Sequence, residues 1–84
     1  MTSIVKRWEK IASDQLVGRK IVAVRYMTDE EAADFDWYDR PLVVALDNGL
    51  QFFASSDDEG NAAGSLFTSD NKQPTLPVIR VGEK

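Results

Sequence analysis

The N-terminal part of the chain predicts an amphipathic helix. Its apolar positions recur at helical spacing and follow a serine that can cap the first turn: Ser3, Ile4, Trp8, Ile11 and Ala12. We place this helix at about residues 3–14. Because an isolated helix of about twelve residues is marginal in water, we expect Trp8 and Ile11 to dock on the rest of the fold.

A strand and a short helix follow this first helix. Gly18 interrupts the helical pattern, and residues 20–27 are rich in the β-branched side chains typical of a strand. Thr28 and Glu31 then form a capping-box pattern, in which each side chain satisfies a free backbone donor at a helix start. We therefore predict a short helix at about residues 29–35.

The centre of the chain, from Pro41 to Ser55, predicts an antiparallel hairpin. Asn48 and Gly49 form a dipeptide that favours a two-residue turn with positive φ at both positions, and apolar runs flank it on both sides. That turn would place Leu46 opposite Gln51 in the ladder. Both faces of the hairpin would then be apolar, so we expect it to lie at the centre of the fold.

The remaining pattern predicts one helical turn and one more strand. Residues 56–59 repeat the capping-box pattern, which predicts a single helical turn near residues 57–63 that ends at Gly64. The run at residues 76–81 predicts the last strand. Because Pro77 has no backbone donor, this strand should lie at an edge or pair only from Val78 onward.

These elements define an α+β fold in a single domain, residues 1–84. We predict an N-terminal helix packed on a mostly antiparallel sheet of about four strands, near residues 20–27, 41–47, 50–55 and 76–81. The alternative is a small, strongly curled β-barrel of the Src-homology type with the helix as a cap. A chain of 84 residues buries only about 60 % of its unfolded surface, which leaves oligomerisation open as a source of stability.

Composition excludes several kinds of chemistry. The chain contains no cysteine and no histidine, so it has no Ser-His-Asp relay, no Cys-His pair and none of the usual zinc ligands. It has no apolar run of the roughly 20 residues that span a bilayer, and the first residues carry charges where a signal peptide is apolar. We therefore predict a soluble cytoplasmic protein without membrane contact, and the lack of cysteine fits a reducing compartment.

Charge is distributed unevenly along the chain. Residues 1–25 carry six Lys or Arg against two acids, a balance of +4, while residues 26–65 carry ten acids against one Arg, a balance of −9. Such a field can orient a partner or a second copy of the chain. A sequence pI near 4.6 argues against nucleic acid as a partner, although Lys6, Arg7, Lys10, Arg19 and Lys20 form a basic group.

Two segments stand out as a candidate binding site. The first interleaves aromatic and charged side chains, and the second is an acidic turn: Asp36, Trp37, Tyr38, Asp39 and Arg40, with Asp57, Asp58, Glu59 and Asn61. If Trp37 or Tyr38 is exposed, the first segment is a contact surface, because such rings bury large area at low entropy cost. The structural alternative is that Phe35 and Trp37 fold back over the small core.

Metal binding and catalysis find little support in the spacing of these carboxylates. Asp57, Glu59 and Asn61 alternate like calcium ligands, but Gly60 is misplaced for such a loop and no bidentate glutamate follows. We predict no metal ligand, no cofactor and no catalytic residue. The alternative is a small-molecule or divalent-metal-dependent enzyme that uses the same carboxylates, but a domain this small rarely encloses a substrate pocket.

Four segments resemble a set of small bacterial proteins of unknown function: LVGRKIVAVRYMTDEEA, WYDRPLVVALDNG, SSDDEGNAAGSLF and LPVIR, which together span most of residues 16–80. The resemblance implies a bacterial origin and a stand-alone domain, and it implies no activity, cofactor or partner. From the residues themselves we predict a non-catalytic protein-interaction or regulatory module that binds another protein, or itself, through the acidic and aromatic segments.

Overall fold

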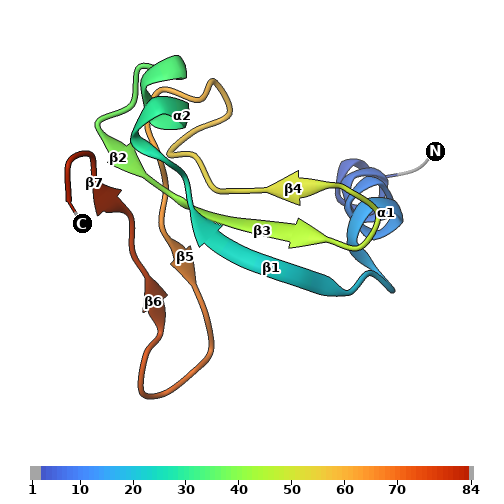
Figure 1. Cartoon of the computed structure of the whole chain (residues 1–84). Coiled ribbons are helices and arrows are strands. Elements are labelled where there is room, and N and C mark those ends of the chain that lie inside the picture. Colours follow the sequence, from blue (N-terminus) through green and yellow to red (C-terminus); the bar gives the residue numbers. More distant parts are fainter. Residues whose placement is uncertain (1–2, 84) are drawn as a thin grey trace.

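The structure is a computed structural model that describes residues 3–83 (Figure 1). Two helices and seven short strands occur in this range: α1 (Ile4–Leu16), β1 (Ile21–Tyr26), α2 (Asp29–Asp34), β2 (Asp39–Arg40), β3 (Leu42–Leu46), β4 (Gln51–Phe52), β5 (Leu66–Phe67), β6 (Thr75–Leu76) and β7 (Ile79–Arg80). All strand pairs are antiparallel. The predicted α+β class is confirmed, and within these residues the strands form separate sheets rather than a closed barrel.

The largest sheet has the strand order β1-β3-β4, so the first strand of the predicted hairpin is central but its second strand, β4, lies at an edge, whereas the prediction placed the whole hairpin at the centre. Two small ladders, β2 with β7 and β5 with β6, extend the fold on the side away from α1 (Figure 1). The single strand predicted at residues 76–81 is divided at Pro77. Thr75–Leu76 pairs with β5 before the proline and Ile79–Arg80 pairs with β2 after it, because the proline itself cannot donate to a ladder.

The hairpin turn differs by one residue from the predicted turn. The Leu46 amide donates to the Leu50 carbonyl at 2.9 Å, so three residues form the loop and only Gly49 has positive φ, at 87°. This geometry is typical of a type I turn that ends in a glycine bulge. Ala45, and not Leu46, therefore lies opposite Gln51. A slip of one residue exchanges the faces of β4, so Phe52 shares the Val44 face and Phe53 points to the opposite face.

Helix α2 and the strands enclose a small core. Thr28 and Glu31 form the predicted capping box, with the Glu31 amide 3.1 Å from the Thr28 hydroxyl and the Thr28 amide 2.8 Å from the Glu31 carboxylate. The buried apolar side chains are Met27, Ala32, Trp37, Pro41, Val43, Val44 and Leu46. Four of these seven, Met27, Ala32, Trp37 and Val43, form one cluster between α2 and the sheet, which places the core far from α1.

Helix α1 forms where the sequence predicts it, but it does not dock on the fold. The Ser3 hydroxyl accepts the Lys6 amide at 3.0 Å, which confirms the cap. No residue of α1 is buried, and 59 % of Trp8 is exposed, so the predicted docking of Trp8 and Ile11 is wrong. Val17 is extended and Gly18 has a φ of 80°, so the chain changes direction between α1 and β1.

Candidate functional site

The two candidate segments meet at the α2 end of the molecule, and Trp37 joins them. Its indole Nε1 donates to the Gly60 carbonyl at 2.7 Å, a contact across 23 residues of sequence. The ring is 95 % buried, stacks on Phe35 with centroids 4.7 Å apart and meets Phe53 edge-on at 6.0 Å. Trp37 therefore lies in the core and holds the acidic loop in place. This is the structural alternative stated above, in which Trp37 folds back over the core.

Asp57 organises the acidic loop. Its carboxylate accepts the backbone amides of Glu59 and Asn61 at 3.0 and 3.2 Å, and the Asn61 side-chain amide donates to its second oxygen at 2.8 Å. These hydrogen bonds, with that from the Asn61 side chain first, hold the pKa of the Asp57 carboxyl below its ordinary value. The predicted helical turn at residues 57–63 is wrong, because the side chain of Asp57 binds the amides that a helix would use.

Backbone contacts close this loop at its base. The Ser56 amide donates to the Ala62 carbonyl at 2.8 Å, and Ser55 and Ala63 form an isolated antiparallel bridge. Gly60 adopts a φ of 74°, a conformation that side chains with a Cβ disfavour. The loop is therefore a closed, hydrogen-bonded unit whose acidic side chains are held at one end of the molecule.

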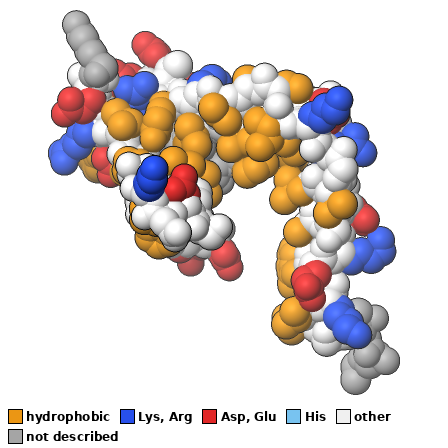
Figure 2. Space-filling model, turned by 90° about the horizontal axis from the view of Figure 1, so that it is seen from below, with side chains coloured by type: hydrophobic (Ala, Val, Ile, Leu, Met, Phe, Trp, Pro, Cys, Tyr) orange, Lys and Arg blue, Asp and Glu red, His pale blue; other side chains and the backbone are white. Residues whose placement is uncertain are grey.

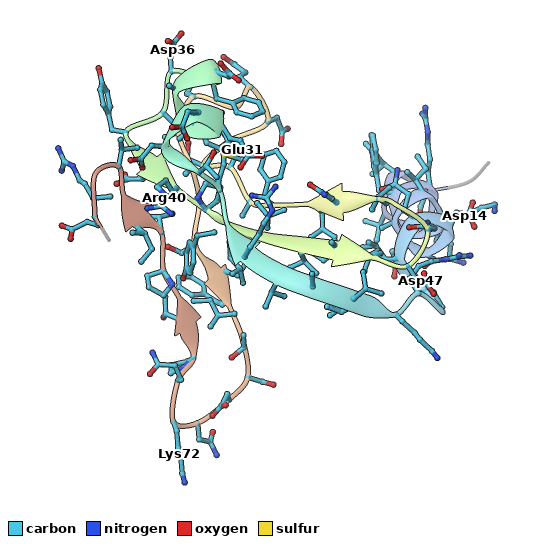
Figure 3. The ribbon with its side chains drawn as sticks, in the orientation of Figure 1. Asp14, Glu31, Asp36, Arg40, Asp47 and Lys72 are labelled. Carbon is cyan, nitrogen blue, oxygen red and sulfur yellow. The ribbon has the colours of Figure 1, made fainter. Side chains whose placement is uncertain are left out.

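The predicted site residues divide into an exposed set and a supporting set. The exposed set is Asp36, Tyr38, Asp57, Asp58, Glu59 and Asn61, and Tyr38 is the most accessible of the candidate aromatic rings at 80 %. Asp36 lies at the tip of this end and points away from the body, with a φ of 61° that aspartate tolerates better than most residues (Figure 3). The exposed set leaves one aromatic ring among several carboxylates for a partner to contact.

The supporting set includes Asp39 and Arg40, which lie in β2 and are half-buried. The Arg40 guanidinium donates to the carbonyls of Met27 at 2.5 Å and Glu83 at 3.0 Å, and its Nε lies 3.6 Å from the Asp29 carboxylate (Figure 3). It thus ties the start of α2 to the C-terminal segment. A guanidinium in this position stabilises the fold under the site, and its hydrogen-bonding groups are directed inward.

A pair that the sequence reasoning missed lies beside α2. Arg25 on β1 and Glu31 on α2 make a bidentate ion pair of 2.7 and 3.0 Å at the edge of a cleft of about 250 Å³, which Phe35 and Phe53 also line. The cleft is smaller than the roughly 300 Å³ at which ligand pockets begin, and its two charges satisfy each other. The signal that could have revealed the pair is the alternation of β1, which places Arg25 on the face that α2 covers.

The pKa of Glu31 predicts how stability responds to acid. The hydrogen bonds from Arg25, and next from the Thr28 amide, lower the pKa of this carboxyl from 4.5 to about 2. Because the folded pKa is the lower one, the stabilisation is complete above pH 4.5 and disappears as the pH falls toward 2. We expect Glu31→Gln to flatten the loss of stability in that window, measured as urea midpoints against pH. An equally steep loss in Glu31→Gln would contradict this assignment, and Glu30→Gln in the same helix is the control.

Two further findings concern metal binding and membranes. Within residues 3–83, no three Asp or Glu side chains lie close enough together to hold a metal ion. In the same range, neither helix combines the length and the apolar character needed to cross a bilayer.

Fold and site together define a small α+β domain with antiparallel ladders that presents an acidic end with one exposed tyrosine. Comparison of the chain with protein-family models, with curated proteins and with solved structures gives no match. The resemblance to small bacterial proteins therefore stays a prediction, and the function must be inferred from the structure itself.

Proposed function

We propose that this protein is a non-catalytic interaction module of the bacterial cytoplasm that binds a protein with a basic surface. The contact surface is the acidic end, formed by Asp36, Tyr38, Asp58 and Glu59. The observation that supports it most strongly is the 80 % exposure of Tyr38 at the end of the molecule where Trp37 holds the acidic loop. Exposed tyrosine is enriched among the side chains that dominate binding energy at protein interfaces.

Preorganisation favours binding at this end. The hydrogen bonds of Asp57 and the bond from Trp37 to Gly60 already order the loop, so a partner does not have to order it on binding. The exposed carboxylates would attract a basic surface over about 10 Å at moderate salt and would raise the association rate. In such a complex the tyrosine provides specific binding energy, and the charges raise the rate of association.

We expect the affinity for a captured partner to fall by about tenfold or more in Tyr38→Ala. The measurement is capture by the immobilised protein at low and at high salt, followed by titration of the purified partner. Phe67→Ala is the matched control, because Phe67 on β5 is equally exposed, at 82 %, and lies outside the acidic end. Trp37 and Asp57 are unsuitable for this test, since each holds the loop together.

The charged side chains are tested separately. Asp58→Asn combined with Glu59→Gln should slow association and weaken its salt dependence, while Asp14→Asn, a surface acid on α1, should change neither. Capture that is indifferent to salt, to Tyr38→Ala and to the double variant would exclude the acidic end as the binding surface.

A further inference from the structure

The apolar side of α1 is uncovered. Ile4, Trp8, Ile11 and Leu16 form a stripe along the helix, and each is exposed, Trp8 to 59 %. A shallow hollow lined by Ile4, Val5, Trp8 and Ala12, with Glu9 at one side, lies on the same side of the helix. A helix of 13 residues is marginal in water without packing. Its amphipathic sequence therefore indicates that the apolar side of α1 packs against another surface.

The largest sheet presents a second uncovered apolar surface. Ile21 and Val24 lie opposite Leu46 and Val44 in the ladder, yet these two side chains of β1 are 64 and 59 % exposed. Figure 2 shows apolar side chains along the underside of the sheet and along the side of α1 that faces the hollow between them. The helix and the sheet thus form two walls of one apolar recess.

The chain exposes more surface than a compact monomer of its mass, and the excess in two chains matches the area that a stable dimer buries. It is 6729 Å², whereas a compact monomer of 9.4 kDa has about 5,000 Å². The radius of gyration of 14.5 Å likewise exceeds the roughly 12 Å of a compact chain of this length. Two chains carry about 3,400 Å² of such excess, which lies within the roughly 2,000 to 5,000 Å² that obligate homodimers bury.

Two-fold symmetry favours a second copy as the occupant. A copy that inserts its α1 into the recess of another chain offers its own recess to the α1 of that chain. In a two-fold arrangement both helices are covered by the same contact, so the apolar side of α1 and the exposed side chains of β1 leave water together in each copy.

We propose that two copies of the chain form a dimer in which α1 of each copy packs across the exposed apolar side chains of β1 of the other. This interface lies at the end opposite the acidic surface, so the inference goes beyond the proposed function and leaves that surface free. The dimer would present two acidic ends to partners, one from each chain.

The oligomeric state of the full chain tests the proposal. We expect sedimentation equilibrium to give the mass of two chains, and Trp8→Glu to give the mass of one. Because Trp8 is 59 % exposed and no residue of α1 is buried, circular dichroism of the strands should survive the change. Ser13→Glu is the matched control, since it adds the same charge on the polar side of α1 and should leave the dimer intact.

Cross-linking identifies the contact itself, and the chain has no native cysteine to interfere. Ile11→Cys and Val24→Cys chains, mixed and treated with a short bismaleimide, should give a product that contains one chain of each. A single-chain mass for the unmodified protein at all concentrations would overturn the proposal. So would a dimer that Trp8→Glu leaves intact, or a dimer in which these two positions do not cross-link. Loss of the dimer would not alter the Tyr38 titration, so the two proposals fail independently.

Discussion

Trp37→Ala should lower the free energy of unfolding by about 3–5 kcal/mol, the range for a large aromatic side chain removed from a core. The ring is one of seven buried apolar side chains among residues 3–83, and it joins the core to the acidic loop through the Gly60 carbonyl. For a small domain this loss is a large share of the total stability. Chemical denaturation followed by circular dichroism measures it.

Trp37→Phe separates the two contributions of this side chain. It keeps an aromatic ring against Phe35 and removes the indole donor, so we expect a loss of about 1–3 kcal/mol from the unpaired Gly60 carbonyl and the reduced volume. Phe67→Ala, on the surface, should change stability by less than about 0.5 kcal/mol. If Trp37→Ala were as mild as Phe67→Ala, the assignment of Trp37 to the core would be wrong.

Gly64→Ala should destabilise the protein by about 1–3 kcal/mol, the range for overpacking. An added Cβ would lie 2.9 Å from the carbonyl carbon and oxygen of Ser55, and both of these are backbone atoms. Relieving this clash would stretch the hydrogen bond of 2.8 Å from the Gly64 amide to the Ala54 carbonyl, and it would disturb the bridge between Ser55 and Ala63. Thermal and urea denaturation both measure this change.

The sign of the Gly64 effect makes it diagnostic. Gly64 does not have positive φ, so the reduced entropy of the unfolded chain alone would make Gly64→Ala stabilising by about 0.4–1 kcal/mol. Gly64→Ser carries the same Cβ and should be destabilising to a similar degree. Ser65→Ala, at the exposed neighbouring position, should be nearly neutral. A stabilising Gly64→Ala would show that the loop can move away from β4 at no cost.

The uncovered apolar surface and the acidic surface lie at opposite ends of the molecule, one proposed for dimerisation and the other for partner binding. α1 and β1 carry the uncovered apolar surface, and α2 with the acidic loop carries the exposed tyrosine and carboxylates. The small core lies at the second end, where it holds the acidic loop in place. If the chain dimerises through the first end, each copy stabilises the part of the other that lacks a core of its own.

Local signals in the sequence were reliable where the structure depends on neighbouring residues. Ser3 and Thr28 begin the two helices because each hydroxyl accepts an amide three residues later. Pro77 divides a predicted strand for an equally local reason, the missing donor. The Ser56 pattern failed, although it resembles the Thr28 pattern. At that position the neighbouring Asp57 competes for the same amides, and Gly60 adopts a left-handed conformation.

The sequence by itself determined the α+β class, the first helix, the two strands of the hairpin without their register, and the segments that make up the candidate site. Only the tertiary structure decided that Trp37 is buried while Tyr38 is exposed, that the two site segments meet, and that α1 leaves the body of the fold. The physical reason is that periodicity reports which side of an element is apolar and says nothing about which surface covers it. Within residues 3–83 no surface of the chain buries a residue of α1, and we infer that a second copy provides that surface.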